Sequence, residues 1–265
     1  MDTRFWGPSG WRLLHTIAAS YEPKLQKKYM REFLEVLPYI LPCKFCRTSL
    51  TDYYDIEPYE KHLVSARALS KWLWVVHNHV NNKLKEQGQN IPQNPAFEQI
   101  YKHYLTQIPH GEQSECEMFP GWDFLFSIAY NHPLKTETSS MPNAPPASEL
   151  KTDRERNRWN VLRACARYRY WRKFWLLLPD VLPEPWRSRW LLKRERECFK
   201  NRKTTVAWLW RKRCLFSEGD PYSAVCKRLV SYSSGCSTST KARTCRRLRL
   251  KKAKKRTSWA PALCP

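Results

Sequence analysis

The sequence predicts an all-α protein with a four- to five-helix bundle, a second helical region and a basic tail. Apolar residues recur every three or four positions in successive stretches of the first hundred residues, which is the period of an amphipathic helix. A proline, Pro42, lies where one stretch ends and the next begins. With 265 residues the chain is long enough for two domains that each bury a core.

The expected helices follow from the periodic positions in order. The first carries Trp11, Leu14, His15, Ala18 and Ala19, and the second carries Tyr29, Phe33, Leu37, Ile40 and Leu41. Pro42 cannot lie inside a helix but suits a helix start, so a third helix is expected from Cys43 to about Tyr53. A long pattern from about Ala66 to Lys85 and a short one over residues 94–105 complete the bundle.

Cys43 and Cys46 form a CxxC pair, a spacing that serves zinc sites, haem attachment and redox chemistry alike. The helix expected after Pro42 places Cys43 in a first turn. Backbone N–H groups without helical partners and the positive end of the helix stabilise a thiolate there. Disulfide exchange requires such a thiolate, so this position favours a redox pair.

Zinc fits the same cysteines less well. The other eight cysteines form no second CxxC, which excludes a four-cysteine site built from two such halves. A mixed site that adds two of His62, His77 and His79 has no usual ligand spacing. We therefore expect no metal.

The long pattern over residues 66–85 has an unusual polar face. Residues at spacings of three and four on that face are Trp74, His77, Asn78, Asn81 and Lys85. Together they supply a ring, a switchable donor, two amides and a cation. A dinucleotide needs that mixture, whereas a plain solvent-facing surface would hold mostly Lys and Glu.

The first hundred residues resemble the Erv/ALR family of FAD-linked sulfhydryl oxidases in three motifs that keep the family's order. The motifs are Trp6-Gly7-Pro8 with Trp11, Leu14-His15-Thr16 and Tyr21; Cys43 to Cys46 behind Leu41-Pro42; and Trp72 with His77-Asn78, Val80-Asn81 and Lys83. The resemblance implies a flavin cradle, usually a homodimer, that oxidises thiol-containing protein substrates and passes electrons to oxygen, giving hydrogen peroxide. It also implies catalytic roles for Cys43 and Cys46 and FAD contacts from Trp6, Gly7, Trp11, His15, Tyr21, Trp72, His77, Asn78, Asn81 and Lys83.

The resemblance assigns different work to the two cysteines. Cys43, at the exposed start of its helix, is expected to accept electrons from a substrate or shuttle thiolate, and Cys46, one turn deeper, is expected to face the flavin. Cellular members often carry further cysteines, but this chain has none before Cys43 and none between Cys46 and Cys116. A shuttle is therefore either in the second half or absent. A catalytic bundle joined to a non-catalytic region resembles the oxidases of large DNA viruses.

The second half echoes the first. Gly121–Ala129 parallels Gly10–Ala18, Leu178–Pro183 parallels Leu37–Pro42, and Ala207–Trp210 parallels Lys71–Trp74. In that register Glu184 and Arg187 replace the cysteine pair, Phe126 replaces His15, and Arg213 and Cys214 replace His77 and Asn78. Either a degenerate repeat or the chance likeness of Trp-rich helices produces this pattern. The first alternative predicts a catalytic domain at 1–115 and a repeat without redox motif at 116–216, with a linker at about 133–153.

Positive charge is concentrated in the second half. Residues 1–115 hold 14 Lys+Arg and 12 Asp+Glu, so 33 and 12 of the totals of 47 and 24 remain for residues 116–265, a net charge of +21. Lys241–Arg256 contains ten basic residues and no acidic one, within an expected tail at 217–265. Such a run is either solvated or contacts nucleic acid non-specifically. The alternative function is therefore a nucleic-acid-binding or scaffolding protein that acts through this tail.

The chain shows neither a long uncharged apolar stretch nor an apolar segment near Met1. We therefore expect no membrane contact and no secretory route. If the protein is viral, the host cytoplasm or the virion is the expected place. The basic tail adds the nucleus as an alternative.

Overall fold

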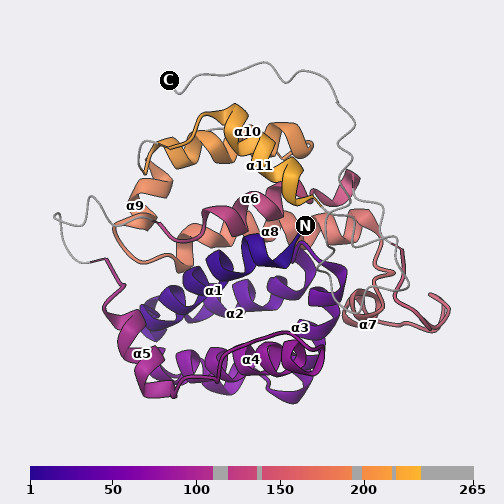
Figure 1. The fold of residues 1–265 in the computed structure, drawn as a ribbon, viewed down its shortest axis with the longest axis horizontal. Coiled ribbons are helices and arrows are strands. Elements are labelled where there is room, and N and C mark those ends of the chain that lie inside the picture. The colour runs from indigo at the N-terminus through magenta and orange to yellow at the C-terminus, as the bar shows by residue number, and fades with distance from the viewer. Residues whose placement is uncertain (110–118, 136–138, 193–198, 217–218, 234–265) are drawn as a thin grey trace.

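The computed structural model describes residues 1–109, 119–135, 139–192, 199–216 and 219–233 (Figure 1). These residues form helices and no β-strand, as the sequence predicts. The helices are α1 (Thr3–Ala19), α2 (Pro23–Ile40), α3 (Lys44–Ile56), α4 (Ala66–Glu86), α5 (Phe97–Leu105), α6 (Trp122–Tyr130), α7 (Asp153–Arg158), α8 (Ala164–Val181), α9 (Trp186–Leu191), α10 (Arg202–Cys214) and α11 (Tyr222–Tyr232), with short 3-10 turns η1 (Glu60–His62) and η3 (Pro133–Lys135). Within these ranges no helix has the length and apolar character needed to cross a membrane.

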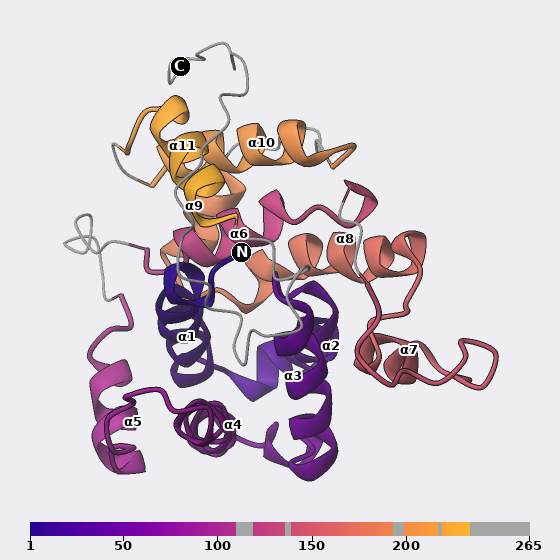
Figure 2. The ribbon, with the colours of Figure 1, turned by 45° about the vertical axis from the view of Figure 1, so that its right-hand side comes forward.

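Helices α1 to α5 form the expected first bundle, in which α4 packs against α1, α3 and α5 (Figure 2). Helix α4 begins at the predicted residue because the Ser65 hydroxyl accepts a hydrogen bond from the Ala68 N–H, 3.1 Å away. Helix α5 begins at Phe97, three residues later than predicted. Pro95 disfavours helical backbone at the residue before it, and Ala96 is the extended N-cap.

The corner between α2 and α3 follows from Pro42. Proline disfavours helical backbone at the residue before it, and Leu41 is extended (ψ 138°), so α2, which includes Pro38, ends at Ile40. The chain turns, and Cys43 becomes the N-cap of α3 with extended backbone (φ −116°, ψ 129°). The predicted helix start at Cys43 is therefore correct to one residue.

The second half repeats the order and the partners of the first. Helix α6 packs against α10, as α1 packs against α4. Across the halves, α1 packs against α6 and α2 against α8, so α6 and α8 lie between the first bundle and α10 with α11 (Figures 1 and 2). Phe33 and Phe174 stack across the α2–α8 contact with ring centroids 5.5 Å apart. The buried apolar residues of both halves form one continuous core.

Equivalent tryptophans of the two halves occupy equivalent places. Trp72 and Trp208 are both buried. Trp74 donates its indole N–H to the Pro95 carbonyl (3.0 Å), and Trp210 donates to the Asp220 carbonyl (3.1 Å), each in the segment after its own helix. The two halves thus agree in the burial of one tryptophan and in the type of hydrogen bond that the other makes.

Two segments differ from their expected character. The Pro- and Ser-rich stretch at about 133–153 includes η3, and Ser139 and Ser140 accept hydrogen bonds from Lys44, so it packs on α3 as well as linking the halves. The tail expected from residue 217 contains α11. Phe5 stacks on Tyr232 with centroids 4.4 Å apart, which ties α11 to the start of α1. The basic run Lys241–Arg256 lies outside the described residues.

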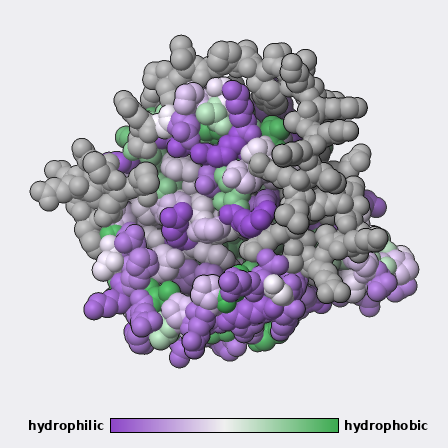
Figure 3. All heavy atoms as spheres, viewed as in Figure 1, coloured by the Kyte–Doolittle hydropathy of each residue, from purple (hydrophilic) through white to green (hydrophobic). Residues whose placement is uncertain are grey.

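The surface that faces the viewer in Figure 3 is mainly hydrophilic, with apolar side chains scattered over it. Charged residues also pair across the two halves. Lys173 of α8 pairs with Glu32 (3.1 Å) and Glu35 (3.4 Å) of α2. All three side chains are partly exposed, so we assign the joint mainly to the apolar contacts beneath them.

The contact between α1 and α6 should be sensitive to a single methyl group. A Cβ at Gly121 would lie 2.6 Å from Leu13 Cδ2 and 2.7 Å from Phe119 Cε1, and both of these side chains are buried. Gly121→Ala should therefore lower the free energy of unfolding by about 1–3 kcal/mol in urea denaturation. Gly7→Ala is the matched control. Nothing lies within 4 Å of its Cβ, so alanine should stabilise the helix by up to about 1 kcal/mol.

Candidate functional site

The cysteine pair lies at the start of α3, in the corner below the end of α2. Cys43 is only 1% exposed, whereas Cys46 is half-buried. The expectation that Cys43 lies exposed was wrong, because the corner is packed into the core that both halves share. Cys46, one turn along the helix, is the more exposed member of the pair.

Cys46 belongs to the face of α3 that meets α4. Ser49 and Tyr53 follow it on that face, and Ser49 accepts a hydrogen bond from the ammonium group of Lys83. The Tyr53 ring stacks on His79 with centroids 5.2 Å apart, and its hydroxyl donates to the His79 carbonyl (3.3 Å). Burial, helped by the negative charge of Asp52, raises the pKa of Tyr53 to about 12. Tyr53 therefore remains a neutral phenol beside the cysteine.

Helices α1, α4 and α5 bring a second group of rings together. His15 Nε2 lies 3.2 Å from His77 Nδ1, so one imidazole donates a hydrogen bond to the other. Trp11 stacks on His77 with centroids 3.9 Å apart and an interplanar angle of 8°. Tyr104 stacks on His15 at 4.7 Å. Two flat surfaces and a histidine pair thus meet at the point where the sequence placed its cofactor residues.

Both histidines are held in the neutral form. Burial, followed by the nearby His77, lowers the pKa of His15 to about 3, and burial lowers the pKa of His77 to about 4. Neutral imidazoles can both donate and accept hydrogen bonds. The pair can therefore act as a polar contact that does not change charge near neutral pH.

The amides of α4 lie on the side of the helix that faces the segment before α5. Asn81 Nδ2 donates to Asn94 Oδ1 at 2.9 Å, and Asn78 is half-buried on the same helix. Helix α4 therefore carries hydrogen-bonding side chains on both sides of its buried face. Asn81 faces the segment before α5, and Lys83 faces α3.

Four predicted contact residues lie elsewhere. Trp6 packs towards Phe124 of α6 (5.8 Å), and Gly7 has open space around it. Tyr21 donates its hydroxyl to the Leu63 carbonyl (3.1 Å), and Trp72 donates its indole N–H to the Glu57 carbonyl (2.8 Å). In this structure Tyr21 and Trp72 serve the core of the bundle.

Three residues at the site were missed from the sequence: Tyr53, His79 and Tyr104. Tyr53 follows Cys46 by seven positions, two turns along the same helix face, and this spacing was an available signal. Tyr104 reaches His15 only through the packing of α5 on α1, which no local pattern shows.

The cysteines of the second half bear on the question of a shuttle. Cys165 is exposed, Cys214 is disulfide-bonded, and Cys226 is half-buried. Burial raises the pKa of Cys226.

In the described part of the chain, no group of three or more His, Cys, Asp and Glu residues could hold a metal ion.

Comparisons with known proteins cover the same part of the chain. The family model described as Erv1 / Alr family matches residues 8–102. "Mitochondrial FAD-linked sulfhydryl oxidase ERV1" of Saccharomyces cerevisiae is 35% identical over 88 residues, which are 32% of this chain and 46% of that protein. "Putative FAD-linked sulfhydryl oxidase 096R" of Invertebrate iridescent virus 3 is 33% identical over 32% of this chain and 60% of its own length. The chain thus spans about half the length of these relatives.

A shorter relative is covered more fully. "Putative FAD-linked sulfhydryl oxidase 347L" of Invertebrate iridescent virus 6 is 30% identical over 92 residues, which are 32% of this chain and 83% of that protein. No solved structure matches the chain significantly. All the similarity lies in the half that carries Cys43, Cys46, His15 and His77.

The buried histidine pair predicts a pH-dependent stability. Because the folded-state pKa values of His15 and His77 lie below the ordinary value of 6.5, stability is full above that pH and falls as the unfolded imidazoles take up protons. Between pH 7 and pH 5 the unfolding free energy of the flavin-free protein should fall by up to about 2 kcal/mol per histidine. Urea denaturation at several pH values measures this.

A variant that carries His15→Gln and His77→Gln keeps two hydrogen-bonding amides without the titration. Its stability should change little over the same pH range. Replacement of the exposed His103 by Gln is the control and should leave the slope as in the wild type. An unchanged slope in the double variant would contradict the assignment.

Proposed function

This chain belongs to the Erv1 / Alr family, and on that premise we propose that it is an FAD-linked thiol oxidase that forms disulfides in protein substrates. One observation carries the proposal. The half-buried Cys46 lies at the start of α3, on the face that meets α4, the helix that carries His77, Asn78, Asn81 and Lys83. Because α3 and α4 are in contact, this arrangement supports the proposal that Cys46 acts next to a cofactor held by α4.

The residues fit FAD in their chemistry. Trp11 and His77, which stack on each other where α1 meets α4, offer ring faces of the kind on which the rings of FAD would stack. The amide of Asn81 and the ammonium group of Lys83 supply donors for ribose and phosphate oxygens. Bound FAD supplies the two-electron acceptor for the reduced cysteine pair and passes the electrons to oxygen, giving hydrogen peroxide.

The protein's own step is disulfide exchange. A substrate thiolate attacks Cys43 Sγ, and the Cys46 sulfur leaves as a thiolate. A second substrate thiolate then attacks the substrate sulfur that is bound to Cys43, and Cys43 leaves as a thiolate. The substrate thus gains the S–S bond that the protein loses. Because Cys43 is 1% exposed, this attack requires a local opening of the corner between α2 and α3.

We assign the second half a supporting role. At the positions that correspond to Trp11 and His15 it has Trp122 and Phe126. Trp122 contacts Phe126 (6.1 Å), Phe216 (5.2 Å) and Trp190 (6.3 Å). An aromatic cluster thus fills the place where the first half has its histidine pair, so we propose one FAD per chain.

Partners and location are part of the proposal. Thiol-containing proteins are the substrates, oxygen is the acceptor and the active form is a homodimer. The net charge of +21 in residues 116–265 favours acidic substrates or nucleic acid at low salt. Because two relatives are viral proteins, host cytoplasm or virion is the proposed place of action.

Replacement of either cysteine tests the exchange step. Cys43→Ser and Cys46→Ser should each lower oxygen consumption with dithiothreitol at least a hundredfold, because exchange needs both sulfurs, while the yellow flavin band is retained. Cys165→Ser, at an exposed cysteine of the second half, is the control and should keep wild-type turnover. Normal turnover in either of the first two variants would refute the proposed mechanism.

The cofactor assignment is tested by a pair of equivalent positions. His77→Ala removes a stacking ring and a polar partner of His15, so FAD content after gel filtration should fall severalfold. Arg213→Ala changes the corresponding position of the second half and should leave one FAD per chain. Two FAD per chain in the wild type, or equal loss in both variants, would contradict the division of roles.

A further inference from the structure

The end of α2 leaves two carbonyl oxygens that need donors. The Pro38 carbonyl would accept from the N–H four residues later, but that residue is Pro42. The donor is instead Nδ2 of Asn157, from the second half, which lies 3.1 Å from the Pro38 carbonyl oxygen. The Leu41 carbonyl accepts from Arg47 Nη1 at 2.7 Å. The turn that carries Cys43 is therefore held by side chains rather than by backbone.

Arg47 is itself held by the second half. Its Nη2 donates to Asn160 Oδ1 at 2.6 Å, and Arg167 Nη2 donates to the same oxygen at 3.2 Å. The amide nitrogen of Asn160 donates to the Ser139 carbonyl at 2.6 Å. Asn160 is 2% exposed, and Arg47 and Arg167 are each 5% exposed. One amide oxygen thus joins two buried guanidinium groups.

This arrangement places positive charge close to the redox pair. Arg47 stands one turn after Cys43, its N–H donates to the Cys43 carbonyl (3.0 Å), and its side chain reaches back past that residue to Leu41. Burial, followed by the charge of Arg47, lowers the pKa of Arg167 to about 9.

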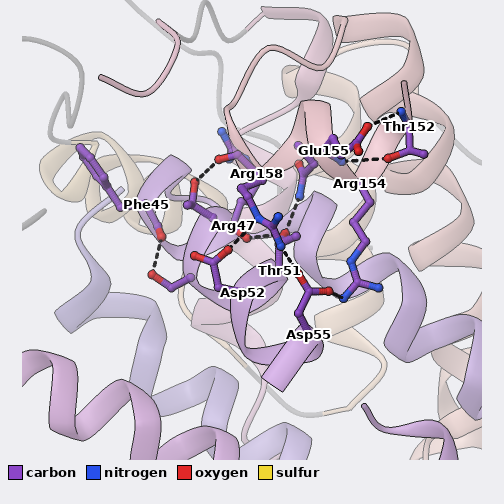
Figure 4. Close-up of polar contacts among 12 residues, drawn as sticks. Phe45, Arg47, Thr51, Asp52, Asp55, Thr152, Arg154, Glu155 and Arg158 are labelled. Carbon is purple, nitrogen blue, oxygen red and sulfur yellow. Dashed lines mark hydrogen bonds and ion pairs between the residues drawn. The ribbon is translucent and has the colours of Figure 1, made fainter. Parts of the chain in front are cut away.

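Ion pairs between α3 and α7 lie on the outer side of α3, and Lys83 of α4 reaches Ser49 on the face that meets α4. Asp52 pairs with Arg158 at 2.7 Å, and Asp55 pairs with Arg154 and Arg158, all with partly exposed side chains (Figure 4). These pairs dock α7 on α3, and Lys44 adds a further cation that donates to Ser139. The buried Arg47 guanidinium, by contrast, lies against the turn that precedes Cys43.

We propose that Asn160 and Arg167, both from the second half, are positioning residues for the Cys43–Cys46 pair. They orient the Arg47 guanidinium so that it fixes the turn before Cys43 and stabilises the reduced pair. The inference rests on the proposed thiol oxidase function and extends it, because residues 116–216 then set the reactivity of the pair. When the disulfide takes up two electrons, one sulfur remains a thiolate, and the buried cations favour that reduced form.

The reduction potential of the pair tests this inference. The flavin-loaded protein is equilibrated anaerobically with glutathione buffers, thiols are alkylated, and the peptide that contains Cys43 and Cys46 is quantified by mass spectrometry. Arg167→Met removes one cation at similar volume. Asn160→Asp keeps an acceptor oxygen for both guanidinium groups but adds a negative charge. Each should make reduction about tenfold less favourable, which lowers the potential by about 30 mV.

The matched control is Arg154→Gln, which loses an exposed ion pair between α7 and α3 without touching Asn160. Its potential should equal that of the wild type. Asn160→Asp keeps the acceptor oxygen but loses the amide donor to the Ser139 carbonyl, so its melting temperature and FAD content are recorded alongside to show that it folds. A wild-type potential in folded Asn160→Asp overturns the inference, whatever Arg167→Met does.

The two proposals fail in different ways. If the proposed function is wrong, the wild type consumes no oxygen with dithiothreitol and carries no flavin. If only the further inference is wrong, the wild type is active and yellow, but the potentials of Asn160→Asp and Arg154→Gln coincide.

Discussion

The missing N–H of Pro42 is the constraint on which the site depends. It ends α2, turns the chain and leaves Cys43 as the N-cap of α3. It also removes the backbone donor for the Pro38 carbonyl, and buried carbonyls without donors are costly. Asn157 supplies the donor from the far half of the chain. The same residue that creates the position of the cysteine therefore makes the first bundle depend on the second.

That dependence agrees with the way the two halves pack. Helices α1 and α2 bury one side against α4 and α3 and the other against α6 and α8. Gly10 and Gly121 both lie where the halves meet. The Phe124 side chain packs closely on Gly10 and the Leu13 side chain on Gly121, so neither position has room for a Cβ atom without a shift. A continuous apolar core has no plane along which the halves separate cheaply. The chain should therefore unfold as one cooperative unit.

The sequence was sufficient for features that depend on neighbours along the chain. Helix period and Pro42 predicted α1 to α4 closely, and the resemblance in the same residues pointed to the family. Contacts between distant segments could not be predicted. The burial of Cys43, the turn of Trp72 into the core and the docking of α7 on α3 all depend on partners many residues away. A composition rich in Pro and Ser suggested a linker at about 133–153, but the signal says nothing about the carbonyl groups that Lys44 binds there.

The second half has aromatic rings where the first half has its histidine pair. A histidine without a cofactor or a polar partner is expensive to bury, so a copy that no longer binds a ligand is more stable with Phe126 in the place of His15. Once rings close that space, the helix pair α6 and α10 becomes rigid at no cost in function. Asn160 and Arg167 can hold Arg47 only if α8 and the segment before it are themselves held in place. The second half thus supplies the Asn160 and Arg167 contacts that hold the Arg47 side chain in place.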